Sequence, residues 1–312
     1  MMELAFIFPG QGSQKVGMGL DLFQAHSVAR ATFEEADAVL KRKLSQLCFE
    51  GPDDALKQTE NTQLAILTDS VAALRVLQEQ GISPAVVAGH SLGEYSALVA
   101  ASVLAFPDAL KLVEYRAQFM SEASRQQDCM MGVVLGLDGK TLQALCKEAK
   151  TAGVVEIANY NCSGQLIVSG ETAAVKQVMS GAKTAGAKRC LPLRVSGAFH
   201  SPLMSPARAC LQGIIDDFPF NAPQVQVVAN VTGDFVPTVD EICYLLIEQV
   251  TAPVQWEKSI RTIGAKGISH FVEVGPGQVL SGMVRRILAK PTCLNLEDTQ
   301  SLEKTMAVIG ET

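Results

Sequence analysis

The sequence predicts an α/β fold, in which a parallel sheet covered by helices is interrupted by a small α+β insertion. Three observations predict it. Short apolar runs alternate with helical patterns up to about residue 126, a strand–helix–strand–strand–helix–strand order fills about 65 residues in the middle, and the first alternation returns after Gly197. Alternating strands and helices are typical of parallel sheets, and the order in the middle is that of a ferredoxin-like unit.

The first part of the chain opens on a buried strand. Leu4–Phe8 is short and apolar and ends at Pro9-Gly10, which predicts a strand followed by a loop. A second apolar run predicts a buried strand over residues 85–89. Helical spacing predicts four helices, over residues 25–47, 61–80, 92–101 and 104–125. In the last helix, Pro107 fits the first turn, where its missing N–H leaves no helical hydrogen bond unmade.

The middle of the chain has the strand–helix–strand–strand–helix–strand order. Strands are expected over residues 131–135, 154–160, 165–170 and 188–195, and helices over 140–151 and 171–185. We therefore assign residues 127–195 to a ferredoxin-like α+β subdomain, and residues 1–126 and 196–312 to the larger core. Two further apolar strands are expected in that core, over 225–230 and 268–274.

The composition excludes several classes of protein. Of the 312 residues, 48% are hydrophobic, which excludes a disordered chain. The 26 Lys and Arg residues against 32 Asp and Glu give a net charge of −6, which argues against a general nucleic-acid binder. The longest apolar run, 97–106, is too short to span a membrane, and the first residues lack an export signal. We expect a cytoplasmic protein without membrane or nucleic-acid partners.

The eight cysteines do not have the spacing of a metal site. Even the nearest two, Cys146 and Cys162, are too far apart to form a CxxC pair. In the absence of an export signal, reduced thiols are the better interpretation. We therefore expect neither a bound metal nor disulfides.

The motif that carries chemistry is Gly89-His90-Ser91-Leu92-Gly93, which matches G-x-S-x-G. It lies between a predicted buried strand and a predicted helix, where this motif forms a sharp turn that exposes a nucleophilic serine. Ser91 and Glu94 also match a capping box, which needs no catalysis. We expect the Glu94 carboxylate to cap the amides of the first turn and Ser91 to be the nucleophile.

A nucleophilic serine needs a base, and the sequence offers four histidines. His90 adjoins Ser91 across a sharp turn and should point away from it. His26 is expected at the surface, and His270 inside a strand. His200 lies in a loop of small residues at the predicted domain boundary, 196–202, where catalytic groups concentrate. His200 is therefore the favoured base.

Charge that develops on the attacked carbonyl needs two backbone N–H donors. One is expected from Leu92, directly after the nucleophile. The other is expected from the loop Pro9–Gly12, although the same glycines fit an ordinary tight turn. The loop lacks both phosphate-binding patterns, G-x-x-x-x-G-K-[ST] and G-x-G-x-x-G.

Taken together, these motifs resemble those of the bacterial malonyl-CoA:acyl-carrier-protein transacylases and of the acyltransferase domains of polyketide and fatty acid synthases. The resemblance runs from about residue 4 to about residue 290 and rests on Phe8–Gln14, Gly89–Glu94, Arg116, Ala198–His200 and Glu273–Gly277. It implies a hydrolase-like core with an inserted ferredoxin-like subdomain.

The resemblance also implies roles for individual residues. Ser91 would attack the thioester of malonyl-CoA, with His200 as base and the backbone amides of Gln11 and Leu92 as the oxyanion hole. Arg116 would pair with the free carboxylate of the malonyl group. A plain helical arginine is more often a solvated charge, but a guanidinium that binds a carboxylate bidentately explains selection for this acyl group.

Three further positions follow from the resemblance. The backbone carbonyl of Gln249 would orient the histidine, Asn161 would lie near the site, and Phe199 matches the loop found with malonyl substrates. The phosphopantetheine thiol of holo acyl carrier protein would then take the acyl group, in a ping-pong transfer without metal or organic cofactor. Carrier proteins of this kind are acidic, so a local basic patch is expected, with Lys188-Arg189 and Arg285-Arg286 as candidates.

Other functions stay open at this point. A serine esterase or thioesterase would send the acyl group to water, and a non-catalytic scaffold would only bind the carrier protein. The pathway also stays open between fatty acid biosynthesis and a discrete acyltransferase of polyketide synthesis. Arg116 and the Gln11 loop favour transfer over simple hydrolysis, and the intact Ser91 and His200 argue against an inactive scaffold.

Overall fold

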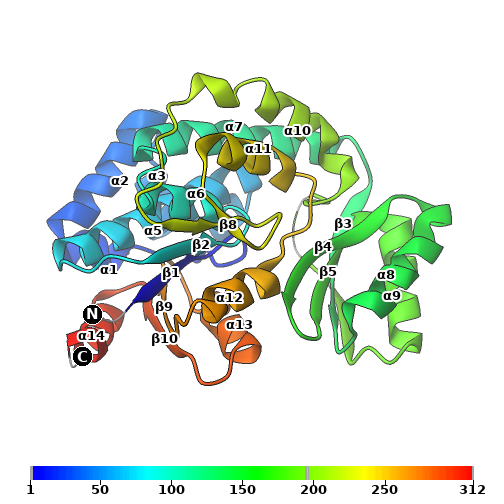
Figure 1. Ribbon diagram of the computed structural model, residues 1–312. Coiled ribbons are helices and arrows are strands. Elements are labelled where there is room, and N and C mark those ends of the chain that lie inside the picture. The colour runs from blue at the N-terminus through cyan, green and yellow to red at the C-terminus, as the bar shows by residue number, and fades with distance from the viewer. Residues whose placement is uncertain (1–2, 194, 196, 311–312) are drawn as a thin grey trace.

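The computed structural model describes residues 3–193, 195 and 197–310, and they form two sheets (Figure 1). The larger sheet has the order β10-β9-β1-β2-β7-β8. Its strands are β1 (Leu4–Phe8), β2 (Val86–Gly89), β7 (Gln226–Val228), β8 (Phe235–Val236), β9 (His270–Val274) and β10 (Thr292–Leu296). The smaller sheet has the order β4-β5-β3-β6, from β3 (Cys129–Leu135), β4 (Val155–Cys162), β5 (Gln165–Glu171) and β6 (Arg189–Pro192).

Helices cover both faces of the larger sheet, because its strands bury apolar side chains on both sides, as β1 does. Neighbouring strands pair in parallel from β10 to β7, and only the short edge strand β8 is antiparallel. Side chains alternate between the faces of a strand. Phe6 and Phe8 accordingly pack in the core beneath α2 (Ser27–Leu40), α5 (Thr59–Glu79) and α7 (Phe106–Arg125). Ile7 joins the second core, beneath α12 (Trp256–Ala265) and α13 (Val279–Ile287).

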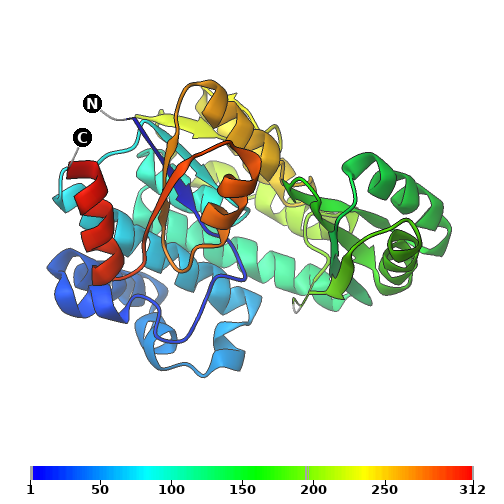
Figure 2. The ribbon, with the colours of Figure 1, turned by 90° about the horizontal axis from the view of Figure 1, so that it is seen from below.

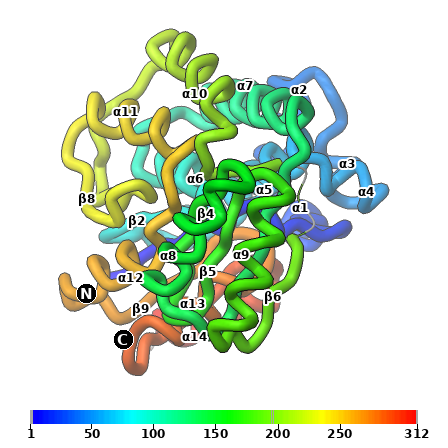
Figure 3. Tube along the Cα trace, turned by 90° about the vertical axis from the view of Figure 1, so that its right-hand side faces the viewer, coloured from blue at the N-terminus to red at the C-terminus, as the bar shows by residue number. Residues whose placement is uncertain are grey.

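The smaller sheet is antiparallel and forms its own layer at one side of the molecule. Its helices, α8 (Gly139–Ala149) and α9 (Thr172–Thr184), lie on its outer face, in front of β4 and β5 in Figure 3. Val134, Val155 and Val168 pack beneath them. Figure 2 shows this unit on the opposite side of the molecule from α14 (Thr299–Gly310).

The small sheet is joined to the larger unit by backbone as well as by packing, through the segment that precedes α12. Tyr160 N donates to Val254 O at 2.9 Å, and Val254 N donates to Ala158 O at 2.8 Å. The inner face of the small sheet contributes Met131 and Ile167 to the core of the larger sheet. These contacts hold the small sheet against the larger unit beside the site described below.

Shorter elements complete the fold. The remaining α-helices are α1 (Leu20–Ala25), α3 (Leu44–Glu50), α4 (Asp53–Leu56), α6 (Gly93–Ala100), α10 (Ser205–Gln212) and α11 (Val239–Gln249). The described residues also form the 3₁₀ turns η1 (Lys150–Ala152), η2 (Pro202–Met204) and η3 (Ile215–Asp217). Within residues 3–193, 195 and 197–310, no helix has the length and apolar character that a membrane span requires.

The predicted α/β fold with a small α+β unit is confirmed, and most element bounds agree within a few residues. The single helix expected over 25–47 is wrong, because the chain there forms parts of three helices, α1, α2 and α3. Lys41 adopts a left-handed conformation (φ 52°), which reverses the chain without a glycine or proline to signal it. The strand expected over 188–195 is shorter, and Arg194 and Ser196 lie outside the described residues.

The start of α6 lies so close to β1 that only glycine fits at residue 93. A Cβ atom on Gly93 would lie 2.1 Å from the carbonyl oxygen of Phe8, a backbone atom that cannot move aside. Gly282, in the exposed part of α13, has nothing within 4 Å of the same position. The two glycines therefore form a matched pair.

We expect Gly93→Ala to lower the free energy of unfolding by about 1–3 kcal/mol, because the added methyl group forces the helix away from the sheet. Gly282→Ala should instead raise it by about 0.5–1 kcal/mol, because alanine loses less backbone entropy in a helix. Urea unfolding followed by circular dichroism measures both. Equal effects of the two substitutions would contradict this account of the close approach.

Candidate active site

Ser91 lies at the tip of the turn between β2 and α6. Its φ of 52° is the left-handed conformation that this sharp strand-to-helix turn requires. Asn230, after β7, holds the turn from the side. Its Nδ2 donates to Gly89 O at 2.6 Å, and its Oδ1 accepts from Ser91 N at 2.6 Å. The turn is thus strained locally and stabilised by a residue from the neighbouring strand.

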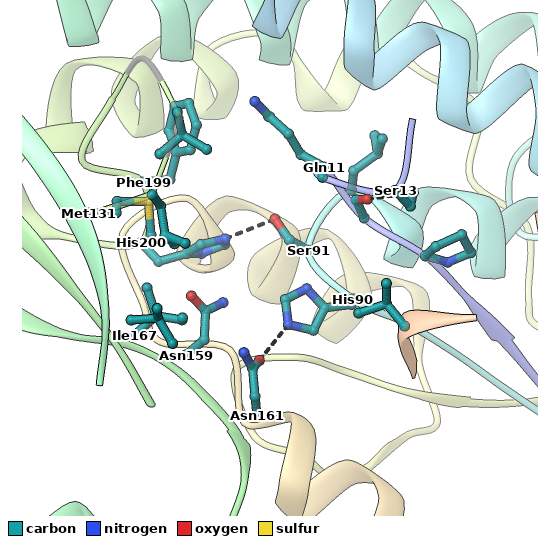
Figure 4. A pocket seen from close by; sticks show the side chains of 18 of the residues that line it. Gln11, Ser13, His90, Ser91, Met131, Asn159, Asn161, Ile167, Phe199 and His200 are labelled. Carbon is teal, nitrogen blue, oxygen red and sulfur yellow. Dashed lines mark hydrogen bonds between the residues drawn. The ribbon is translucent and has the colours of Figure 1, made fainter. Parts of the chain in front are cut away.

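His200 lies within hydrogen-bond distance of the serine. Ser91 Oγ and His200 Nε2 are 2.8 Å apart (Figure 4). On the other side of the ring, Nδ1 faces the carbonyl oxygens of Gln249 at 2.8 Å and Ala252 at 3.2 Å. Carbonyl oxygens only accept, so Nδ1 carries the proton and Nε2 is free to accept from the hydroxyl.

The environment of His200 keeps its ring neutral. The side chain is buried, and burial together with the nearby positive charge of Arg116 lowers its pKa to about 3. The two carbonyl contacts oppose this shift without overcoming it. A neutral imidazole is the form that can take a proton from Ser91.

Arg116 reaches the site from α7 and is only 1% exposed. The reading of this residue as a solvated helix charge is therefore wrong. Its Nη1 donates to Gln63 Oε1 at 2.6 Å, and its Nη2 donates to Gln249 Oε1 at 2.8 Å. Nη2 also lies 3.3 Å from Ser91 Oγ, which brings a positive charge next to the nucleophile.

Glu94 does not cap the first turn of its helix, contrary to expectation. Its carboxylate accepts from Asn230 N, at 3.3 and 3.4 Å, and from Gln249 Nε2 at 2.6 Å. The helix begins at Gly93, so Glu94 is inside the first turn and its side chain extends toward neighbouring segments. Burial raises the pKa of Glu94 to about 7, against the opposing effects of these donors and of Arg116.

A pocket of about 450 Å³ opens in front of Ser91, between the two sheets. Gln11 and Leu92 line it on the side of the larger sheet, and Asn161 and Phe199 line it as well. Figure 4 shows Gln11 and Ser13 on one side of Ser91, with Met131 and Ile167 on the other. Much of the remaining lining is apolar, from Met120, Met131, Val133, Ile167, Leu193 and Met283.

The other histidines do not contact the serine hydroxyl. His90 Nε2 lies 2.9 Å from Asn161 Oδ1 (Figure 4), and the His90 ring packs edge-on against Trp256. Because an amide oxygen only accepts, Nε2 of His90 carries the proton. His26 lies between α1 and α2, and His270 begins β9; neither lines the pocket.

Sequence reasoning missed Gln63, Asn230 and Ala252, which position the groups that it found. Asn230 carried one signal, because it is the last residue of a predicted buried strand. Gln63 sits among the apolar residues of a long helix, and Ala252 acts through its backbone, so neither differs from an ordinary residue in the sequence. Among the described residues, no three His, Cys, Asp or Glu side chains gather as a metal site would require.

Comparisons with known proteins agree on one family. Residues 5–310 match the model of the acyl transferase domain. A Bacillus subtilis relative named malonyl CoA-acyl carrier protein transacylase is 42% identical over 312 residues, which cover 100% of this chain and 98% of the relative. An Escherichia coli K12 relative of the same name is 44% identical over 303 residues, covering 97% and 98%.

Solved structures give the same result. An acyl carrier protein S-malonyltransferase from Vibrio cholerae superposes with a TM-score of 0.94 at 41% identity, covering 97% of this chain and 99% of that one. A malonyl-transacylase in complex with a type II PKS acyl-carrier protein superposes with a TM-score of 0.96, at 41% identity and coverages of 98% and 99%. With the fold, the nucleophile turn and nearly the whole length in agreement, the chain belongs to the acyl transferase domain family.

Proposed function

We propose that this protein transfers the malonyl group from malonyl-CoA to the phosphopantetheine thiol of acyl carrier protein, through a malonyl-serine intermediate, in fatty acid biosynthesis. One observation carries the proposal. The same serine oxygen lies 2.8 Å from a neutral imidazole and 3.3 Å from a buried guanidinium. The first contact suits nucleophilic attack, and the second suits an acyl group that ends in a carboxylate.

The first half-reaction forms the ester. His200 Nε2 takes the hydroxyl proton as Ser91 Oγ attacks the thioester carbonyl. The backbone N–H groups of Gln11 and Leu92 stabilise the negative charge on the carbonyl oxygen. When the tetrahedral intermediate collapses, the C–S bond breaks and the CoA sulfur takes the proton from His200. The carbonyls of Gln249 and Ala252 keep the ring oriented throughout, where a classical triad has a carboxylate.

Arg116 selects the acyl group in this scheme. A malonyl ester places its free carboxylate a short distance beyond the attacked carbonyl, and the guanidinium lies next to the serine oxygen. Acetyl-CoA has no such carboxylate, so it leaves the buried cation unpaired. Phe199 and Asn161 line the pocket and bound the space that the acyl group and its thioester occupy.

The second half-reaction reverses the first with a new thiol. The phosphopantetheine thiol gives its proton to His200, and its sulfur attacks the ester carbonyl of malonyl-Ser91. The malonyl thioester of the carrier protein leaves, and Ser91 regains its proton. No cofactor is needed to balance these steps, because one thioester is exchanged for another.

The proposed carrier protein is acidic, and the candidate basic residues differ in whether their side chains already donate to other segments of the chain. Lys188 and Arg189 are exposed at the edge strand β6. Arg286 donates to Ser163 O and Gln165 Oε1, and Arg285 donates to Cys293 O. We favour Lys188 and Arg189 for docking, since the guanidiniums of Arg285 and Arg286 already hold other segments.

Two further proposals accompany this function, and they concern the subdomain bounds and the location of the protein. We propose that residues 127–195 form a ferredoxin-like subdomain inserted into a core of residues 1–126 and 196–312, and that the protein works in the cytoplasm. A second candidate function is the same transfer in a polyketide pathway. It is favoured by the match to the transacylase solved with a type II PKS acyl-carrier protein.

The covalent mechanism predicts a single malonyl adduct on intact-mass measurement after mixing with malonyl-CoA, and none on the Ser91→Ala variant. Holo acyl carrier protein should then discharge the adduct and gain the malonyl group itself. Fast release of free malonate in the absence of carrier protein would instead identify a hydrolase. A wild-type protein that shows no adduct at any time point would contradict the mechanism.

Arg116→Ala should reduce the preference for malonyl-CoA over acetyl-CoA by about ten- to a hundredfold, because a charge-assisted hydrogen bond to the carboxylate is lost. Arg125→Ala is the matched control, since Arg125 lies on the same helix, exposed, in an ion pair with Glu60. The ratio of kcat/KM values for acyl-enzyme formation measures the effect. An unchanged ratio in Arg116→Ala would remove this residue from substrate selection.

The imidazole of His200 should stay neutral from pH 8 down to pH 5, because its pKa lies at about 3. NMR of labelled histidine, assigned with His200→Gln, measures this directly. The unfolded chain binds a proton at this residue near pH 6.5 and the folded chain does not. Its contribution to stability is therefore complete above about pH 6.5 and is lost as the pH falls toward 3. Titration near pH 6.5 in the folded protein would contradict the assigned environment.

A further inference from the structure

The side chain of Gln249 contacts Arg116, Ser91 and Glu94, whereas its backbone carbonyl faces His200. Its Oε1 accepts from Arg116 Nη2 at 2.8 Å. Its Nε2 donates to Ser91 O at 3.0 Å and to Glu94 Oε2 at 2.6 Å. The side chain is fully buried. These contacts are separate from the main-chain carbonyl that faces His200, so a substitution can alter them and leave the carbonyl in place.

The chemistry of the partners fixes which way the Gln249 amide points. A guanidinium has only donors, so the amide oxygen must face Arg116. The backbone oxygen of Ser91 only accepts, so the amide nitrogen must face it. Reversing the amide would set donor against donor and acceptor against acceptor in a buried place, which is costly. The side chain therefore has one pose.

Arg116 is held by neutral groups. Its acceptors are the amide oxygens of Gln249, at 2.8 Å, and Gln63, at 2.6 Å, and the hydroxyl oxygen of Ser91, at 3.3 Å. Over the described part of the chain, residues 3–193, 195 and 197–310, no carboxylate lies within ion-pair distance of this guanidinium. The Gln249 amide contacts both the guanidinium of Arg116 and the carboxylate of Glu94.

This spacing has an electrostatic consequence. A carboxylate in direct contact would occupy the fork of the guanidinium, with which planar anions pair bidentately. A buried cation without any compensating charge would be costly to fold. With one amide between them, the ionised form of Glu94 offsets part of the cost of burying Arg116. It does not occupy the N–H groups of the guanidinium that remain beside those bonded to Gln63 and Gln249, such as Nε, which has no hydrogen-bond partner among the described residues.

We propose that Gln249 is a positioning residue for substrate selection: its amide keeps the Glu94 carboxylate one hydrogen bond away from Arg116, so that the guanidinium is free to pair with the carboxylate of the acyl group. The inference rests on the proposed function, because it extends the role given there to Arg116. It assigns the side chain of Gln249 to selectivity and its main chain to orientation of the histidine.

The test is the isosteric substitution Gln249→Glu. It places a carboxylate directly on Arg116, so the preference for malonyl-CoA over acetyl-CoA should fall at least about tenfold, mainly through a higher KM for malonyl-CoA. Rates of acyl-enzyme formation at several concentrations of each thioester give this ratio. Gln78→Glu, an exposed change on α5 with the same charge, is the control and should keep the wild-type ratio.

A second variant separates selection from packing. Glu94→Gln/Gln249→Glu restores the net charge and lets residue 94 donate to residue 249, so it should unfold at a temperature nearer to the wild type than Gln249→Glu does. Its preference for malonyl-CoA should stay low, because a carboxylate still contacts Arg116. Recovery of the wild-type preference in the double variant, or its retention in Gln249→Glu, would overturn the inference.

The same series distinguishes the inference from the function beneath it. If the wild-type protein forms no malonyl adduct, the proposed transfer fails. If it forms the adduct and the Gln249→Glu variant selects as the wild type does, only the role of the Gln249 amide fails. Binding of malonyl-CoA and acetyl-CoA to Ser91→Ala, with and without Gln249→Glu, gives the selectivity by calorimetry without turnover. Equal loss of affinity for both thioesters would also overturn the inference.

Discussion

The left-handed turn at Ser91 is the constraint on which the rest of the site depends. The chain must pass from β2 to α6 within three residues, and the start of the helix lies against the backbone of β1. Asn230 stabilises the turn through Gly89 and Ser91, so the adjacent strand must end where it does. The strain at Ser91 is offset by contacts at the carboxyl ends of the parallel strands, which meet at this edge of the sheet. The sheet therefore determines where the nucleophile lies.

The charges of the site follow from its burial. A histidine enclosed beside a cation loses affinity for protons, and His200 is thereby kept in its basic form. The cation, Arg116, is itself buried and contacts neutral amides, while the carboxylate of Glu94 stands further back. The pocket thus combines an uncharged base with a positive charge that a ligand can reach. The neutral state of the base comes from excluding water, whereas the guanidinium keeps its charge although burial lowers its pKa.

The sequence was sufficient for the fold class and for the reacting pair, because their signals are local or few. A buried strand, a G-x-S-x-G turn and a helix lie side by side in the chain, and only four histidines compete to be the base. Gln63 and Asn230 were missed because their partners are distant in sequence, so the geometry exists only after folding. The expectation for Glu94 was wrong for a related reason: the local capping pattern was outweighed by donors from other segments.

The groups that orient His200 are carbonyl oxygens, at Gln249 and Ala252. Every amino acid has this oxygen, so no substitution of a side chain can delete it. A mutational scan would record residue 252 as tolerant, although its backbone faces the imidazole. The orientation of the histidine is therefore set by the backbone conformation at the end of α11 and between α11 and α12. That path is also bonded to the small sheet through Val254, so this part of the machinery can be inherited while the residues that perform it change.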